Sequence, residues 1–161
     1  MDNYLQTVPT LDLSKFTEGD ADKMNEFSSE LGNSFKKTGF AIIKNHGLTQ
    51  DITKKLYATI QSFFQLDDDK KVKYYFPELY GQRGYVVKGQ EHAKGSSKGD
   101  LKEFFHFGQH LPPANGEEYP ENVLVDERPD FNAVGQKTFA ALEKTGCFVL
   151  RALAIHLGLD E

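Results

Sequence analysis

Hydrophobic residues recur along the first part of the chain at spacings of three and four, which predicts two amphipathic helices. The first stripe ends at two lysines and a glycine, a combination typical of a helix C-terminus. The second stripe follows a threonine that can cap the N-terminus of its helix. The residues concerned are Met24, Phe27, Leu31 and Phe35, ending at Lys36, Lys37 and Gly39, and then Thr49 followed by Ile52, Leu56, Ile60, Phe63 and Phe64.

Shorter apolar runs predict strands. Residues 8–13 alternate apolar and polar side chains as an edge strand does, and such a strand tolerates Pro9. Residues 39–47 form an apolar run between two glycines, which predicts a buried strand and then a turn, with His46 bonded to backbone in that turn. The segment 84–87 and the aromatic run 101–108 predict two further strands.

A long helix is predicted at the end of the chain, with Pro129-Asp130 as its start signal and Gly158 as its stop. From Gly146 onward nearly every residue is apolar, and a helix that is apolar all round requires protein on every side. Only three residues follow Gly158. We therefore expect that protein is missing after Glu161. The stripe of this helix is Phe131, Val134, Thr138, Leu142, Val149, Leu153 and Leu157.

Two polar segments lie between these elements. Three aspartates, residues 67–69, precede Lys70, Lys71 and Lys73, an order that complements a helix dipole and predicts a short exposed helix with a solvated charged face. Residues 88–98 are polar and glycine-rich, which predicts a mobile loop.

Composition narrows the class of protein. The 161 residues, 39% of them hydrophobic and 13 of them Phe, suffice for one domain with a real core. A net charge of −5 and a pI near 5.5 disfavour nucleic acid and membranes as partners. The single cysteine, Cys147, excludes an internal disulfide, and its apolar surroundings predict that it is packed in the core. We expect a cytoplasmic protein.

Residues that could carry chemistry by themselves are scarce. His106 and His110 are four apart, but in a strand that spacing corresponds to about 13 Å, too far for one metal ion. None of the five histidines is followed two residues later by Asp or Glu, so the local half of a two-histidine, one-carboxylate iron site is absent. No Gly-x-Ser-x-Gly motif occurs either. The chain therefore offers no metal ligands and no catalytic residues of its own.

Several segments, in this order, are similar to the N-terminal region of the isopenicillin N synthase-like oxygenases, which depend on 2-oxoglutarate and iron(II). The most distinctive is Gly39-Phe-Ala-Ile-Ile-Lys-Asn-His46-Gly47. The others are Val8-Pro-Thr-Leu-Asp-Leu13, Phe63-Phe64, Gly84-Tyr85, Asp100-Leu-Lys-Glu-Phe-Phe-His-Phe107 and the closing stretch Leu153–Glu161.

The resemblance implies an α+β fold, in which a helical N-terminal part buttresses an incomplete double-stranded β-helix (jelly-roll) core and a long C-terminal helix follows. Residues 1–161 would be one N-terminal domain. The family's iron ligands, His-x-Asp and a distant His, and its 2-oxoglutarate-binding Arg would lie beyond the chain. Fe(II) and 2-oxoglutarate are thus expected in the full-length enzyme, and neither is expected on this chain alone.

The resemblance also implies substrate-contacting positions. Alternate residues of a strand share a face, so Phe104 and His106 point one way and Phe105 and Phe107 the other. By analogy with the family, Phe104 and His106 would face the substrate. The alternative is that all four side chains belong to the core, as aromatic residues of strands usually do.

Arg83 and Tyr85 are the remaining predicted substrate contacts. A guanidinium suits bidentate contact with a substrate carboxylate, but the family's substrate-binding Arg lies two residues before the glycine, and Arg83 lies one residue before Gly84. The alternative is an exposed arginine beside a glycine turn.

The function implied is the N-terminal portion of a dioxygenase that hydroxylates, desaturates or cyclises a small organic molecule. Its partners would be that molecule and its own C-terminal jelly-roll half. The alternative is a truncated, non-catalytic remnant of the family that binds or dimerises through its apolar helix.

Overall fold

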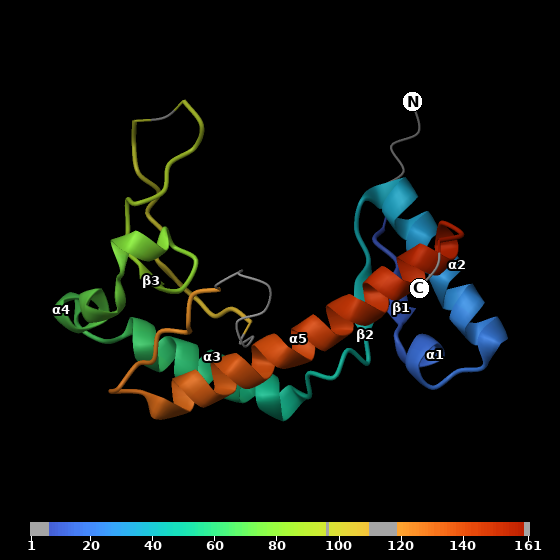
Figure 1. The fold of residues 1–161 in the computed structure, drawn as a ribbon, viewed down its shortest axis with the longest axis horizontal. Coiled ribbons are helices and arrows are strands. Elements are labelled where there is room, and N and C mark those ends of the chain that lie inside the picture. The colour runs from blue at the N-terminus through green and yellow to red at the C-terminus, as the bar shows by residue number, and fades with distance from the viewer. Residues whose placement is uncertain (1–6, 96, 110–118, 160–161) are drawn as a thin grey trace. The chain divides into compact units, whose positions relative to one another are not determined.

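The computed structural model describes residues 7–95, 97–109 and 119–159. The chain divides into two compact units. Unit 1 comprises Met1–Leu48 and Ala141–Glu161, and unit 2 comprises Thr49–Ala140. The long helix α5, Pro129–His156, begins in unit 2 and ends in unit 1 (Figure 1).

Unit 1 is built around a parallel pair of strands. Leu11 lies opposite Ile43 in this pair, and the helices between the two strands form the crossover that parallel pairing requires. The Asp20 side chain caps the longer helix by accepting a hydrogen bond from the Lys23 N–H at 3.0 Å, and Gly39 ends it with φ +76°. The elements are β1 (Thr10–Asp12), α1 (Ser14–Thr17), α2 (Ala21–Thr38), β2 (Ile42–Lys44) and the C-terminal part of α5.

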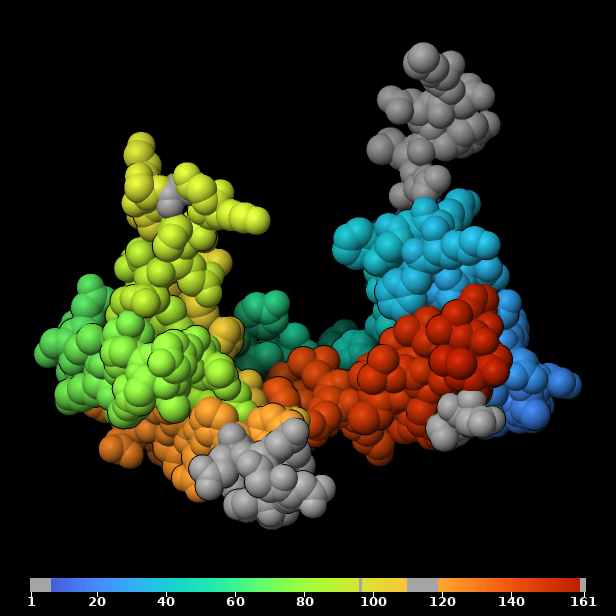
Figure 2. Space-filling view, turned by 45° about the horizontal axis from the view of Figure 1, so that its top comes forward, coloured from blue at the N-terminus to red at the C-terminus, as the bar shows by residue number. Residues whose placement is uncertain are grey.

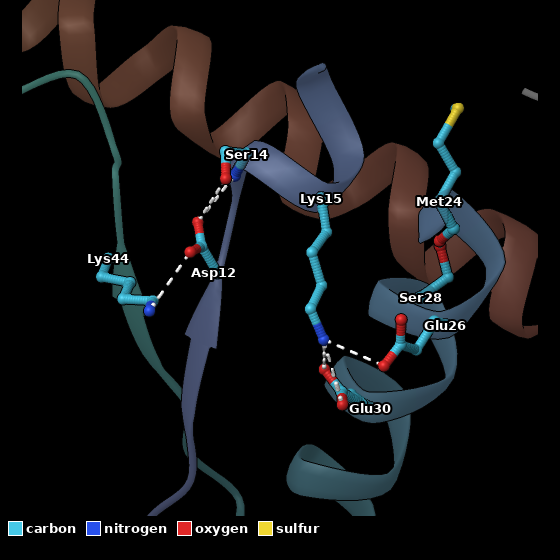
Figure 3. Close-up of polar contacts among 8 residues, drawn as sticks. All are labelled: Asp12, Ser14, Lys15, Met24, Glu26, Ser28, Glu30 and Lys44. Atoms are coloured by element: carbon cyan, nitrogen blue, oxygen red, sulfur yellow. Dashed lines mark hydrogen bonds and ion pairs between the residues drawn. The ribbon is translucent and has the colours of Figure 1, made fainter. Parts of the chain in front are cut away.

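The core of unit 1 lies between this sheet, α1, α2 and α5. Its fully or nearly fully buried residues are Leu11, Leu13, Phe16, Phe27, Leu31 and Ala152. Polar contacts border it (Figure 3). Asp12 accepts a hydrogen bond from the Ser14 hydroxyl at 2.7 Å and pairs with Lys44 at 3.2 Å. Lys15 pairs with Glu26 and Glu30 of α2 at 3.0 and 3.3 Å, which joins α1 to α2.

Unit 2 consists of helices and an antiparallel pair of strands. Thr49 caps its first helix, as predicted, by accepting a hydrogen bond from the Ile52 N–H at 3.3 Å. The elements are α3 (Gln50–Phe64), α4 (Asp68–Lys71), the 3₁₀ turns η1 (Val72–Tyr74) and η2 (Pro77–Leu79), β3 (Gly84–Val86), β4 (Phe104–His106) and the N-terminal part of α5.

Aromatic rings make up the core of unit 2. The Phe63 ring of α3 is fully buried, stacks on Phe131 of α5 with centroids 4.9 Å apart, and meets Phe105 of β4 edge-on at 5.1 Å. Tyr74 and Tyr85 complete the cluster around Phe63 at 6.3 and 5.9 Å. Because such ring pairs add to the free energy of area burial, these contacts hold β4 against two helices.

The elements predicted from the sequence are present, but some predicted exposures are wrong. Ile42 of β2 is 52% exposed, although a buried strand was expected. The two-stranded sheet has a core on one face alone, where Ile43 packs, so Ile42 points away from it. Cys147 is exposed rather than packed, because α5 turns Phe148, Val149 and Ala152 toward the core instead.

The apolar surface of α5 is only partly covered. Within unit 1, Leu142, Leu150 and Leu157 are 50%, 67% and 66% exposed. The described residues thus form a mixed α and β structure, in which each sheet has two strands. None of the described helices is both long and apolar enough to cross a membrane.

Candidate functional site

The strand pair β3–β4 in unit 2 carries three of the four residues predicted to contact substrate. In its register, Tyr85 lies opposite Phe105 and Gly84 lies opposite His106. Opposed residues share a face of the pair. Tyr85 therefore lies with Phe105 on the core face, whereas Phe104 and His106 lie on the other face.

Ring contacts confirm this division. Phe105 and Phe107 both contact Phe131 in the core, at 4.9 and 5.1 Å between centroids. Phe104 and His106 contact each other instead, at 4.7 Å and an interplanar angle of 44°, with His106 exposed and Phe104 half-buried. The alternative that all four side chains belong to the core is wrong for His106, which is exposed, whereas Phe104 is half-buried like Phe105 and Phe107.

His106 is held by the turn that precedes β3. Its Nδ1 lies within hydrogen-bonding distance of the Gly81 carbonyl oxygen. Tyr80 and Gly81 both adopt positive φ angles, +49° and +74°. This left-handed pair of residues is unusual, particularly for Tyr80, which is 88% exposed.

Arg83 is buried, with 8% of its surface exposed, so the alternative of an exposed arginine is wrong. Its guanidinium lies against Gly108, where a Cβ would be 1.9 Å from Cζ, so only glycine leaves room for it. The Arg83 side chain donates to the Gln82 carbonyl at 2.8 Å, and its Nε is buried with no hydrogen-bond partner among the residues that the structure describes. Asn122 holds the backbone of Gly108 through hydrogen bonds of 2.8 and 2.9 Å.

A partly buried charge cluster lies next to the start of β4, and the sequence did not reveal it. Lys71 is 3% exposed, although the charge run to which it belongs was predicted to be solvated. Its Nζ lies 2.8 Å from Glu103 and 2.9 Å from Asp68, and 5.6 Å from the centre of the Tyr85 ring. The Tyr85 hydroxyl donates to the same Glu103 oxygen. The cluster thereby joins α4, β3 and the residue immediately before β4.

The cluster shifts the pKa of each member. Burial alone would lower the pKa of Lys71, but hydrogen bonds to Glu103 and Asp68 outweigh it and raise that pKa. Burial alone would raise the pKa of Glu103, but hydrogen bonds from Lys71 and Tyr85 lower it. Burial and the bond to Glu103 together raise the pKa of Tyr85 to about 12. At neutral pH the cluster therefore holds an ion pair and a neutral phenol.

The described residues do not fit an iron site, since no three of their His, Cys, Asp and Glu side chains come together as a ligand group. His110, one of the two histidines considered as a metal pair, lies outside the described residues. The described part of the predicted loop, residues 88–95 and 97–98, projects from the body of unit 2 (Figure 2). Its base is closed by hydrogen bonds between backbone groups, from Gly89 N–H to Asp100 and from Asp100 N–H to Glu91.

A family model and several known proteins match most of the chain. The family model described as non-haem dioxygenase in morphine synthesis, N-terminal, matches residues 8–127. The 2-oxoglutarate-Fe(II) type oxidoreductase ppzD of Metarhizium rileyi is 31% identical over 167 residues, which cover 95% of this chain and 46% of that protein. The proline hydroxylase buaE of Petromyces alliaceus is 29% identical, over 96% of this chain and 49% of its own length. The chain spans about half the length of the curated relatives it matches.

Solved structures share the fold. A 2OG-Fe(II) oxygenase family protein of Caulobacter crescentus superposes with a TM-score of 0.77 at 33% identity, over 94% of this chain and 48% of that one. Neurospora crassa T7H, solved with alpha-KG and thymine, superposes with a TM-score of 0.78 at 24% identity, over 99% and 51%.

Proposed function

Because this chain belongs to the family of non-haem dioxygenase N-terminal regions, we propose that it forms the N-terminal half of an oxygenase that uses Fe(II) and 2-oxoglutarate to oxidise a small organic molecule. The observation that carries the proposal is the family match over residues 8–127. Relatives with 2-oxoglutarate-dependent names match over nearly the whole chain and support it. Hydroxylation, desaturation and cyclisation are the outcomes that we propose for the substrate.

In this proposal the chain supplies the scaffold and one wall of the substrate pocket. Phe104 and His106 form that wall, since they share one face of β4 and contact each other rather than the aromatic core around Phe63. Tyr85 supports the wall from the core face through Glu103. The loop at 88–98 is the segment we propose as a lid.

Arg83 is the residue that we propose to bind a substrate carboxylate. A buried guanidinium without a full set of acceptors is costly, and a carboxylate is the acceptor that matches its geometry. The buried Nε of Arg83 is the donor that would be satisfied.

The metal ligands and the 2-oxoglutarate site belong, in this proposal, to a C-terminal jelly-roll half. The described residues present the apolar surface such a partner requires: Leu142, Leu150 and Leu157 of α5 recur at intervals of eight and seven, which places them on one side of the helix. Exposed apolar residues aligned in this way are typical of an interaction surface.

The same residues support the second candidate function, a non-catalytic protein that dimerises through α5. In that case two copies of the chain would cover each other's exposed leucines. The two functions differ in stoichiometry: the first requires a heterologous jelly-roll half, and the second requires only the chain itself.

The test is to co-express the chain with the C-terminal half of the M. rileyi relative and to measure Fe(II)-dependent conversion of 2-oxoglutarate to succinate. We expect a one-to-one complex that forms succinate, and no succinate from either half alone. A stable homodimer of this chain that ignores the C-terminal half would overturn the oxygenase proposal and favour the second function.

A further inference from the structure

We propose that the Gly81 carbonyl fixes His106 as the tautomer with hydrogen on Nδ1, so that Nε2 is left on the exposed side chain as a hydrogen-bond acceptor that selects ligands with an N–H or O–H donor. This inference rests on the proposed function, because it takes the Phe104–His106 face as the substrate wall. Beyond that function, it identifies His106 Nε2 as the atom that contacts the ligand and names the chemical class of ligand that this atom binds.

The tautomer follows from the contact between His106 and the turn. A carbonyl oxygen only accepts hydrogen bonds, so the Nδ1 atom that approaches the Gly81 carbonyl must carry the hydrogen. In the neutral imidazole the other nitrogen, Nε2, then has a lone pair and no hydrogen. Nε2 has no hydrogen-bond partner among the residues that the structure describes.

The turn is built to present that carbonyl. Tyr80 and Gly81 are consecutive left-handed residues, and the Tyr80 side chain is 88% exposed, so burial of the tyrosine does not account for its backbone conformation. Unfavourable backbone conformations are kept where they serve a site. Here the conformation directs the Gly81 carbonyl toward the His106 ring.

Phe104 restricts the shape of the ligand. Its ring lies 4.7 Å from that of His106 and is only half-buried, so the two rings form one continuous partly exposed surface. The Lys102 Nζ lies 5.7 Å from the centre of the Phe104 ring, so a flat ring would contact Phe104 beside this ammonium group while its donor reaches Nε2. The nearby Lys102 is paired with Glu91 at 2.6 Å and Asp100 at 3.3 Å, and this neutralisation leaves the His106 acceptor as the selective group on this face. The ligand class is therefore a small planar ring with an N–H or O–H group.

The tautomer can be measured on the full chain by two-bond ¹H–¹⁵N correlation of the imidazole rings at about pH 8, above the ordinary pKa of histidine. We expect a protonated Nδ1 and an unprotonated Nε2 for His106. His46 is the internal control, because its Nδ1 accepts a hydrogen bond from the Leu48 N–H at 3.4 Å and must be unprotonated. The two histidines should thus show opposite patterns in one spectrum. The Nε2–H pattern at His106 would overturn the inference.

Ligand selection is tested with indole and with benzofuran, which has the same shape but oxygen in place of the N–H group. We expect indole to bind about threefold more tightly, as one neutral hydrogen bond at an open site allows, and to move the His106 Nε2 resonance. In the variant His106→Asn the amide reaches only the position of Nδ1, so the preference should disappear. In His106→Gln the amide reaches the position of Nε2, and part of the preference should remain. Equal affinities for the two probes, or no binding of either, would contradict the ligand class.

These measurements are separate from the test of the proposed function. An active complex whose His106 has the opposite tautomer rejects this inference and leaves the oxygenase intact. A chain that shows the predicted tautomer and forms no succinate with the C-terminal half rejects the oxygenase instead.

Discussion

Lys71 is a buried charged residue, so neighbouring carboxylates must compensate its positive charge. It is 3% exposed, and its ammonium group contacts the carboxylates of Glu103 and Asp68, of which only Glu103 is itself mostly covered. Removing one partner of a buried ion pair leaves an uncompensated charge, which costs far more than losing an exposed pair. Replacing Lys71 or Glu103 should therefore lower the free energy of unfolding more than replacing a residue of an exposed ion pair.

The first prediction compares neighbouring lysines. Lys71→Met should lower the free energy of unfolding by about 3 kcal/mol, because Glu103 then loses its closest cation. Lys70→Met is the matched control: its ion pair with Asp67 is exposed, and the expected change is below about 0.5 kcal/mol. Urea denaturation of the full chain measures both values. Equal losses for the two variants would show that Lys71 is not held as the structure describes.

The second prediction concerns pH. The pKa of Glu103 is lowered in the folded chain from its ordinary value of 4.5, so its charge stabilises the fold above that value, and this stability is lost as pH falls through the lower folded pKa. Glu103→Gln should be clearly less stable than the parent at about pH 7. The difference should begin to shrink below about pH 4.5 and disappear below the lower folded pKa, where protonated Glu103 resembles Gln. A difference that stays constant across this range would show that ionisation of Glu103 is not the cause.

At the scale of secondary-structure elements, some ends and turns require a glycine because the backbone there has a positive φ angle. Gly84 begins β3 with φ +79°, and a Cβ there would lie 2.6 Å from the Tyr74 carbonyl oxygen and 3.0 Å from Val123. Gly89 has a similar φ of +81° but open space around its Cβ position. The two glycines therefore separate the cost of backbone strain from the cost of a collision.

Gly84→Ala should lower the free energy of unfolding by about 3 kcal/mol, because it combines the left-handed conformation with a clash against backbone. Gly89→Ala should cost about 1 kcal/mol, since only the conformational term remains. Thermal and urea denaturation provide the comparison. If Gly89→Ala lowered the free energy of unfolding as much as Gly84→Ala, the close approach of the Tyr74 carbonyl to Gly84 would not contribute to the loss.

For the molecule as a whole, the exposed leucines of α5 are one apolar surface that the described residues leave uncovered. Leu150→Glu should change the stability of the isolated chain by less than about 0.5 kcal/mol, because its side chain is already 67% exposed. The same variant should weaken the complex with a C-terminal jelly-roll half at least about tenfold, since a charge would enter an apolar contact. Lys144→Glu, an exposed change about 120° around α5 from Leu150, is the control. Calorimetric titration of the two halves measures both, and equal affinities for the two variants would exclude this side of the helix as the contact.

The alternation of side chains along β4 is the part of the candidate site that could be predicted from the sequence. The alternation of Phe104 to Phe107 placed one pair of rings in the core and the other outside it, because the pleat of a strand depends only on order along the chain. The exposure of Arg83 and of Lys71 could not be predicted. Each is covered by residues distant in the sequence, Gly108 for Arg83 and Glu103 for Lys71, and nothing local in the chain signals that proximity.

Order along the chain was thus enough to establish the helices, their caps and the family, since hydrophobic spacing, capping and short motifs are encoded in neighbouring residues. Folding alone established which charges are buried, which nitrogen of His106 carries the hydrogen and which side of α5 stays uncovered. Those properties depend on contacts such as Gly81 with His106 and Lys71 with Glu103, which arise only when separated segments pack together.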